Sequence, residues 1–422
     1  MEYLLLLTFI LAPAYVIRFS LFHLPTNLLM LWVFLVWIIF GFWLLKNKKI
    51  RDFINFKLSV DKKILIPTTL FFLSGIISLF IGGVDRAKLG QFIVLFLQPI
   101  SLFFIAGYIF SAGGRSASGG KQNPKAKDYL LTTIYLLVAI AGLYATVQYF
   151  TLLGLPSAWW GNSVEPKRAL AFFVHPNFYA LWSAPLLALL TPDLGLKIKD
   201  LRKNYPHIIA WILGSAGLLL SLSRAGWLGL ASAVLVYLIF AADNKIRKII
   251  FSGIIIIVIV IVSVPNLRWR FILPFYGEKS ASSRVELWQD GLRAVKESPV
   301  LGLGLTGFAN SYGQLNTDPT LDTHNFPHNI FLNFWVETGL LGLISFIWLI
   351  SIYIYRGLHR AVSPPSQGEV PAAGGGGGWS DDKTIKLSIS LFLIALLTQG
   401  LIDNPYFKND LALVFWVILA LA

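Results

Sequence analysis

The sequence contains no cysteine, so no disulfide and no thiolate metal site can form in it. Charge is also scarce, because Asp, Glu, Lys and Arg make up only 13% of the 422 residues. Soluble globular domains carry about 25% charged residues. The shortage of charge excludes an ordinary soluble protein, and the absence of cysteine leaves the redox compartment open.

Apolar residues are abundant instead, at 56% of the chain. Long apolar runs lie at about 3–19, 27–45, 64–82, 90–110, 129–150, 176–191, 207–222, 226–241, 249–265, 328–355, 385–402 and 411–422. Most of these runs are long enough to cross a hydrocarbon core of roughly 30 Å as a helix. They predict an all-α fold, a polytopic bundle of about 12 transmembrane spans that forms a single membrane-embedded domain over 1–422. The first run has no basic n-region and no obvious cleavage site, which favours a retained helix over a signal peptide.

Lys and Arg are distributed unevenly between the predicted loops. Of these residues, 21 lie in the loops 46–63, 111–128, 192–206, 242–248 and 356–384, and only six lie in the alternate loops 83–89, 151–175, 223–225 and 403–410. Cytoplasmic loops are the ones enriched in Lys and Arg, so the first set is predicted to be cytoplasmic, together with both termini. The net charge of +14 follows from these loops, and nucleic acid is not an expected partner. The glycine- and serine-rich stretches at 111–128 and 361–384 predict flexible cytoplasmic loops.

One long polar segment, residues 266–327, interrupts this pattern. The alternation of spans places it outside the cytoplasmic membrane as a large external loop that contains short amphipathic helices. Ser283 followed three residues later by Glu286 is a capping-box pattern and predicts a helix that starts there. Pro299 predicts where that helix ends. Val285, Trp288, Leu292 and Val295 are spaced to form its apolar face.

Arg284 is expected in the first turn of this helix, although an ordinary surface arginine would give the same pattern. A second arginine, Arg224, lies in an apolar stretch, 207–241, that is too long for one span. Because basic loops flank both ends, this stretch is predicted to be a hairpin with its tip near Arg224. A charge at that depth needs an anionic partner or water, and a snorkelling interfacial arginine is the alternative. Lys167 and Arg168 reach the same side from the loop 151–175.

His328 follows Pro327, a residue favoured at the first helical position, so His328 is expected in the first turn of a transmembrane helix. The positive end of the helix dipole disfavours the imidazolium form, so a neutral imidazole there can accept a proton. A histidine that only bonds to backbone is the alternative. Glu337 lies nine residues further along, and a carboxylate inside a membrane helix indicates function. It is expected either to pair with Arg224 or Arg168 or to be protonated.

Three motifs occur in order along the chain. The first is SLSRAG at Ser221–Gly226, and the second runs from RVELW at Arg284 to PVLGLG at Gly304. The third begins HNIFL at His328 and continues ETGLLG from Glu337. Together with the stretch from Arg168 to Asn177, these motifs resemble the O-antigen ligase/polymerase (Wzy_C-type) superfamily of membrane glycosyltransferases. The resemblance covers roughly 160–345 and does not separate the branches of that superfamily.

The resemblance implies transfer of a glycan from an undecaprenyl-pyrophosphate carrier to an acceptor hydroxyl on the outer side of the bacterial inner membrane. The acceptor would be a glycan, a glycolipid such as lipopolysaccharide, or a protein hydroxyl. It implies a metal-independent, inverting reaction with no cofactor, and the sequence has neither a phosphate-binding glycine loop nor a carboxylate cluster for a divalent cation. The expected catalytic residues are His328 as base with Arg224 and Arg284 on the pyrophosphate. The expected substrate-binding residues are Arg168, Lys167, Asn329, Trp288 and Glu337.

Several alternatives share these features. An O-antigen or polysaccharide polymerase and a protein O-oligosaccharyltransferase fit the motifs as well as a ligase does. A transporter or flippase of a lipid-linked saccharide also needs many spans and a basic cavity. Such a transporter usually shows two related halves and broken helices at the midplane, whereas the polar residues here cluster on the predicted outer side, in the second half of the sequence. A sensor or scaffold would not require the arginine and histidine set.

Overall fold

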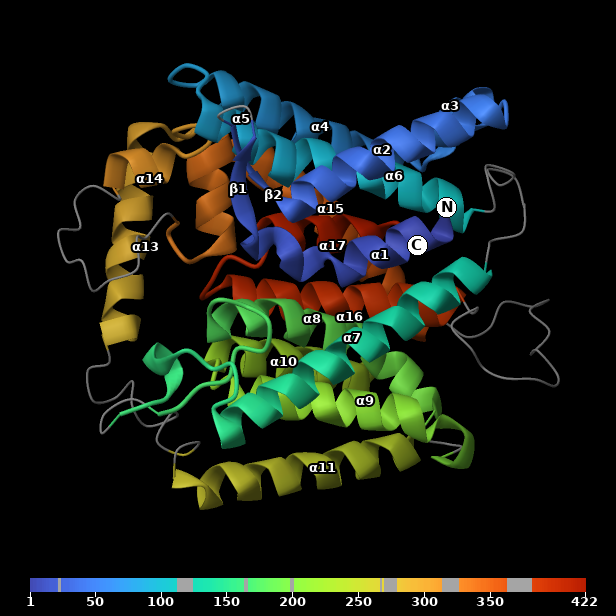
Figure 1. Ribbon diagram of the computed structural model, residues 1–422, viewed down its shortest axis with the longest axis vertical. Coiled ribbons are helices and arrows are strands. Elements are labelled where there is room, and N and C mark those ends of the chain that lie inside the picture. The colour runs from blue at the N-terminus through green and yellow to red at the C-terminus, as the bar shows by residue number, and fades with distance from the viewer. Residues whose placement is uncertain are drawn as a thin grey trace. The chain divides into compact units, whose positions relative to one another are not determined.

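A computed structural model describes residues 1–21, 24–111, 124–162, 166–197, 201–265, 268, 279–312, 326–362 and 382–422. These residues form helices and one short β-hairpin, so the predicted helical class is confirmed (Figure 1). The helices are α1 Glu2–Ile10, α2 Leu28–Lys46, α3 Ile50–Ser59, α4 Lys62–Phe80, α5 Arg86–Phe92, α6 Gln98–Phe110, α7 Pro124–Thr151, α8 Pro176–Lys197, α9 Leu201–Leu220, α10 Arg224–Phe240, α11 Asn244–Ser263, α13 Lys279–Glu297, α14 Gly307–Tyr312, α15 Ile330–Val362, α16 Asp382–Gly400 and α17 Asn409–Leu419. Most of the flexible loops predicted at 111–128 and 361–384 lies outside the described residues.

The apolar runs produce the long helices. In the described part of the chain, seven segments are long and apolar enough to cross a membrane, at Leu28–Lys46, Lys62–Phe80, Arg86–Phe110, Lys125–Thr151, Asn244–Ser263, Ile330–Ala361 and Asp382–Gly400. Two shorter apolar helices, α10 and α17, accompany them. The chain is therefore a multi-pass membrane protein, while the predicted count of about 12 spans is not confirmed.

The first apolar run does not form the single helix that was expected over 3–19. Helix α1 ends at Ile10, and a 3₁₀ turn, Ala12–Val16, follows it. Pro13 explains the break, because proline has no backbone N–H and clashes with the preceding helical turn. Strands β1 Arg18–Leu21 and β2 Leu24–Asn27 then pair antiparallel.

The described chain separates into two compact units. The first consists of Met1–Leu130, Ser282–Ile352 and Gly400–Leu421. Its aromatic core joins the beginning, middle and end of the sequence, because the ring of Phe71 on α4 contacts those of Phe334 on α15 and Trp416 on α17. Tyr406 belongs to the same core and donates its hydroxyl hydrogen to the carbonyl of Leu95 at 2.6 Å. This core fixes the turn between α16 and α17 against the start of α15.

Helix α13 belongs to the first unit from Ser282 onward and runs across the direction of α4 and α6 (Figure 1). Its predicted start is wrong, since the helix begins at Lys279 and includes the Ser283 of the supposed capping box. A capping box is defined by only two residues, and the same pair occurs here inside a helix. The end is as predicted, at Glu297 before Ser298-Pro299. Its buried face also differs from the expected one, because Leu287, Ala294 and Val295 pack against Phe308 and Val336, whereas Val285 and Leu292 are exposed.

Helix α15 is broken at Gly339, which has φ +65°. The segment after α13 docks into this break: Leu303 N–H donates to the carbonyl of Val336 at 2.7 Å, and Leu340 N–H donates to that of Val300 at 3.0 Å. A Cβ on Gly339 would lie 2.3 Å from the carbonyl oxygen of Val300. Only glycine therefore fits, on both conformational and steric grounds. The break ties the polar segment to the helix that follows it.

The second unit consists of Leu131–Ala281, Tyr353–Gln399 and Ala422. Helix α8 packs against both α9 and α10. Helices α9 and α10 form the hairpin predicted for 207–241, with its turn at Ser221–Ser223 and Arg224 as the first residue of α10. Leu222 in the turn has φ +52° and is fully buried. The prediction of a hairpin with its tip near Arg224 is confirmed.

Candidate active site

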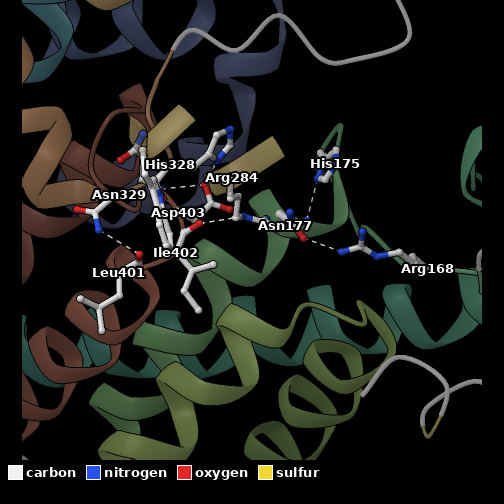
Figure 2. A network of polar contacts seen from close by, with 11 residues as sticks. Arg168, His175, Asn177, Arg284, His328, Asn329, Leu401, Ile402 and Asp403 are labelled. Atoms are coloured by element: carbon white, nitrogen blue, oxygen red, sulfur yellow. Dashed lines mark hydrogen bonds and ion pairs between the residues drawn. The ribbon is translucent and has the colours of Figure 1, made fainter. Parts of the chain in front are cut away.

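His328 and Asp403 form the centre of the polar cluster in the first unit (Figure 2). The imidazole Nδ1 lies 3.0 Å from Oδ1 of Asp403, and the two side chains are 29% and 7% exposed. A carboxylate accepts hydrogen bonds only, so Nδ1 carries the hydrogen of this bond. Nε2 is then the nitrogen that can take up a further proton. This arrangement is the one in which a carboxylate orients a histidine base.

The backbone around His328 differs from the expected first turn of a helix. His328 has φ +47°, and α15 begins only at Ile330. Asn329 caps the helix instead, since its Oδ1 accepts the backbone N–H groups of Phe331 and Leu332 at 3.1 and 3.0 Å. Asn329 thereby satisfies two of the backbone N–H groups that the first turn of a helix leaves without a helical partner. A left-handed conformation in a non-glycine residue is costly and is found often at functional sites.

Three further contacts hold this cluster together (Figure 2). Arg284 on α13 donates from Nε to the carbonyl of Ile402 at 3.0 Å, one residue from Asp403. The amide of Asn329 donates to the carbonyl of Leu401 at 3.1 Å. Trp288, one turn after Arg284, donates its indole N–H to the carbonyl of His328 at 3.3 Å. The predicted residues Arg284, Trp288, His328 and Asn329 are therefore brought together, around the turn after α16.

The Asp403 carboxyl group is nearly buried, and burial alone would raise its pKa. His328 opposes that effect through its charge and its hydrogen bond, and the guanidinium of Arg284 and the backbone N–H of Asn404 act in the same direction. Their combined effect holds the pKa of Asp403 well below its ordinary value. Asp403 is therefore a carboxylate at any physiological pH. The site combines a fixed negative charge, an imidazole and an arginine.

Glu337 lies further along α15 and is fully buried. Its Oε2 accepts the backbone N–H of Thr306 at 2.7 Å, and its Oε1 accepts that of Phe308 at 3.4 Å. These bonds anchor the start of α14 to α15. The structure thus gives Glu337 a role in fixing the polar segment, and its expected role in substrate binding stays a prediction.

Arg168 in the second unit is held at the hairpin turn (Figure 2). Its Nε donates to the carbonyl of Ser221 at 2.9 Å, and its Nη2 donates to Oδ1 of Asn177 at 2.6 Å. The guanidinium also lies over the ring of Trp159, 5.6 Å from its centroid. These contacts place Arg168 beside the turn that leads to the half-buried Arg224.

Lys167 points to a different neighbour, with Nζ 4.7 Å from the centroid of the Tyr149 ring. His175, which the sequence did not single out, accepts the backbone N–H of Asn177 on Nδ1 at 3.0 Å. Neutral His175 therefore carries its proton on Nε2. The predictions that Arg168, Lys167 and Arg224 bind substrate stay predictions.

Asp403 is the residue that the sequence did not identify. The run Asp403-Asn404-Pro405 reads as an ordinary turn, and the bond to His328 joins residues 75 positions apart. One feature of the sequence could have identified Asp403. It is an acidic residue directly after an apolar run, in a loop predicted to lie on the same side of the membrane as His328. Among the described residues, no group of three or more Asp, Glu and His side chains could hold a metal ion.

Comparison with known proteins gives a family match over part of the chain. Residues 209–347 match the family model described as O-Antigen ligase. This range includes the hairpin with Arg224, helix α13 with Arg284, and His328, whereas Arg168 and Asp403 lie outside it.

Two curated proteins are similar over most of the chain. An uncharacterized protein of Haemophilus influenzae is 25% identical over 318 residues, which cover 70% of this chain and 73% of that protein. The ComP-specific O-oligosaccharyltransferase of Acinetobacter baylyi is 27% identical over 313 residues, 69% of this chain and 54% of that protein. The match thus spans about half the length of the Acinetobacter protein.

Proposed function

Because the chain carries an O-antigen ligase family domain at residues 209–347, we propose that it is a glycosyltransferase that moves a glycan from an undecaprenyl-pyrophosphate carrier to an acceptor hydroxyl. The observation that supports this most directly is the His328–Asp403 pair beside Arg284. This arrangement brings together a base, His328, and a cation, Arg284, that can bind a phosphate oxygen. The reaction takes place on the outer side of the inner membrane, as the loop charges predict.

The proposed chemistry is a single displacement at the anomeric carbon. His328 accepts the proton of the acceptor hydroxyl, whose oxygen forms the new bond to the anomeric carbon. The bond from that carbon to the pyrophosphate oxygen breaks, and undecaprenyl pyrophosphate leaves with the electron pair. One displacement inverts the anomeric configuration. Asp403 orients the imidazole and stabilises the imidazolium that forms.

The developing charge on the leaving group requires cations. Arg284 supplies one, because a guanidinium donates two parallel hydrogen bonds to phosphate oxygens. Arg224 and Arg168 act on the same group in this proposal, with Lys167 adding positive charge. Asn329 and Trp288 hold His328 and contact the donor, and Glu337 keeps the polar segment in place for binding. The reaction is independent of metal and cofactor.

A second candidate for the acceptor is a protein hydroxyl, which the similarity to the Acinetobacter O-oligosaccharyltransferase favours. Purified protein, a defined undecaprenyl-pyrophosphate oligosaccharide and a panel of acceptors would test the proposal. The panel holds a lipopolysaccharide core, a second donor molecule and a protein with exposed serine and threonine hydroxyls. Transfer to one acceptor, unchanged by EDTA, is the expected result. No transfer to any of them, with donor movement across vesicles, would identify a transporter instead.

Replacing Asp403 with asparagine should lower kcat about 10- to 100-fold with little change in the KM for donor. The amide can still accept the Nδ1 hydrogen of His328 but lacks the charge that stabilises the imidazolium. Asp290→Asn on α13, whose carboxylate pairs with exposed Arg293, is the control and should change neither quantity. Wild-type kcat in Asp403→Asn would contradict the orienting role.

Sidedness can be measured with single cysteines because the chain has none. Lys296→Cys lies at an exposed position of α13 and should react with a membrane-impermeant maleimide in spheroplasts. Asn47→Cys, in a loop predicted to be cytoplasmic, should react only after lysis. The reverse labelling pattern would show that the loop charges assign the orientation wrongly.

A further inference from the structure

A cavity of about 260 Å³ lies in the first unit, and neither His328 nor Asp403 belongs to its lining. It is formed by α2, α5, the π-helical turn after α5, the start of α14 and the start of α17. Its lining consists of Asn27, Met30, Ala87, Gly90, Gln91, Val94, Thr306 and Asn409. Half of these side chains are amides or hydroxyls, and none carries a charge.

One residue of the lining has a polar atom whose hydrogen bonding is not satisfied within the described part of the chain. Oε1 of Gln91 is buried and has no hydrogen-bond partner among the described residues. A buried acceptor without a partner costs free energy, and the residue that carries it is one of those that line the cavity. Thr306 adds a second sign of function, because it adopts φ +63°, a left-handed conformation that is costly for a β-branched residue.

Gly90 is not explained by packing. A Cβ at this position would meet no atom within 4 Å, and its φ lies outside the range that favours glycine. A glycine inside a helix is destabilising relative to alanine, so its presence here needs another cause. The residue lines the cavity, and a Cβ there would stand in open space. The π-helical turn Ile93–Leu97 begins three residues later, and such turns are frequent at functional sites.

The lining selects the class of ligand. Amide side chains offer both donors and acceptors and match the hydroxyl groups of a neutral sugar, while Met30 and Val94 suit its apolar face. Lys88 on α5 is turned to other partners, since its Nζ donates to the carbonyls of Ile81 and Gly83 at 2.7 and 2.9 Å. A phosphate or carboxylate would find no compensating charge in the lining.

We propose that this cavity binds one neutral sugar residue of a substrate glycan, through Asn27, Gln91, Thr306 and Asn409. This inference rests on the proposed glycosyl transfer and adds a subsite to it. The cavity is coupled to the candidate active site along the chain. Thr306 is bonded to Glu337 on the helix that follows His328, and Asn409 lies six residues after Asp403.

The test uses substitutions that fill the cavity without removing a contact. Gly90→Leu places a side chain in it and should leave the helix intact, since leucine favours helix more than glycine does. Gly41→Leu on α2 is the matched control, because a Cβ there also meets nothing within 4 Å but lies outside the cavity. Gln91→Met removes the amide at nearly constant length. Purified proteins in lipid nanodiscs are compared by transfer kinetics and by saturation-transfer NMR with free glucose, N-acetylglucosamine and glucose 1-phosphate.

We expect Gly90→Leu and Gln91→Met to raise one KM about ten-fold and to abolish the signal of the neutral sugars, while kcat stays within about two-fold. A change in the donor KM assigns the sugar to the donor, and a change in the acceptor KM assigns it to the acceptor. Transfer that proceeds in Gly90→Leu as in Gly41→Leu would overturn the subsite and leave the proposed function standing. Loss of sugar binding in Gly90→Leu, in a protein that transfers to no acceptor, would overturn the function alone. A glucose 1-phosphate signal as strong as that of glucose would contradict a site for neutral sugars.

Discussion

Replacement of Arg284 with alanine should lower kcat for glycan transfer about 100- to 1,000-fold, the usual effect of removing one donor to a developing negative charge. The guanidinium is fixed by its bond to the Ile402 carbonyl, beside the carboxylate of Asp403. Arg284→Lys should recover only part of the loss. A lysine keeps the charge but cannot donate two parallel hydrogen bonds to a phosphate.

Arg293 provides the control on the same helix. It is 66% exposed and pairs with Asp290, so Arg293→Ala should leave transfer unchanged. Arg224→Ala and Arg168→Ala, made in parallel, test whether the arginines of the second unit act in the same step. Melting temperature and size-exclusion profile in detergent show whether each variant folds. Full activity of Arg284→Lys would contradict the proposed contact with the pyrophosphate.

Replacement of His328 with glutamine should lower kcat about 100- to 10,000-fold, the range expected for loss of a positioned base. Glutamine can still form hydrogen bonds, but it cannot accept the proton of the acceptor hydroxyl near neutral pH. Donor affinity should stay nearly normal, because the arginines remain. His359→Gln, at an exposed position in the last turn of α15, is the control and should retain full activity.

The pH profile separates a base from a purely structural histidine. Wild-type transfer should fall on acidification, because a protonated imidazole cannot accept the proton of the acceptor hydroxyl. Asp403 cannot cause that fall, since its pKa lies well below its ordinary value and the carboxylate stays ionised. The residual activity of His328→Gln should show no such acid limb. Turnover close to that of the wild type in this variant would leave His328 with a positioning role only.

Local patterns were sufficient for much of the architecture. The apolar runs predicted most of the long helices, and basic loops at both ends of 207–241 predicted the hairpin at Arg224. Pro299 marked the end of α13. These features depend on residues close together in the sequence, so hydrophobicity and backbone chemistry determine them directly. The motif residues Arg284 and His328 lie in the same unit, where both contact the turn that contains Asp403.

The rest depends on contacts between distant parts of the chain. Asp403 looked like a turn residue because its partner, His328, lies 75 positions earlier. Pro327 suggested a helix start, but Asn329 offered a better cap and left His328 in a left-handed conformation. Nothing in the sequence around Gly90 and Gln91 indicated that these residues line a cavity. Both residues line a cavity, and four separate segments of the chain come together only in the fold to form it.

The break in α15 at Gly339 also bears on how this helix fits the thickness of a bilayer. As one straight rod, its 33 residues would measure roughly 50 Å, well beyond a hydrocarbon core of about 30 Å. The stretch from Gly339 to Val362 alone is roughly 36 Å long and suffices to span that core. The buried polar side chains Asn333 and Glu337 both precede the break. Hydrophobic matching therefore constrains only the longer arm, which leaves the shorter arm free to carry polar groups that lipid would not tolerate.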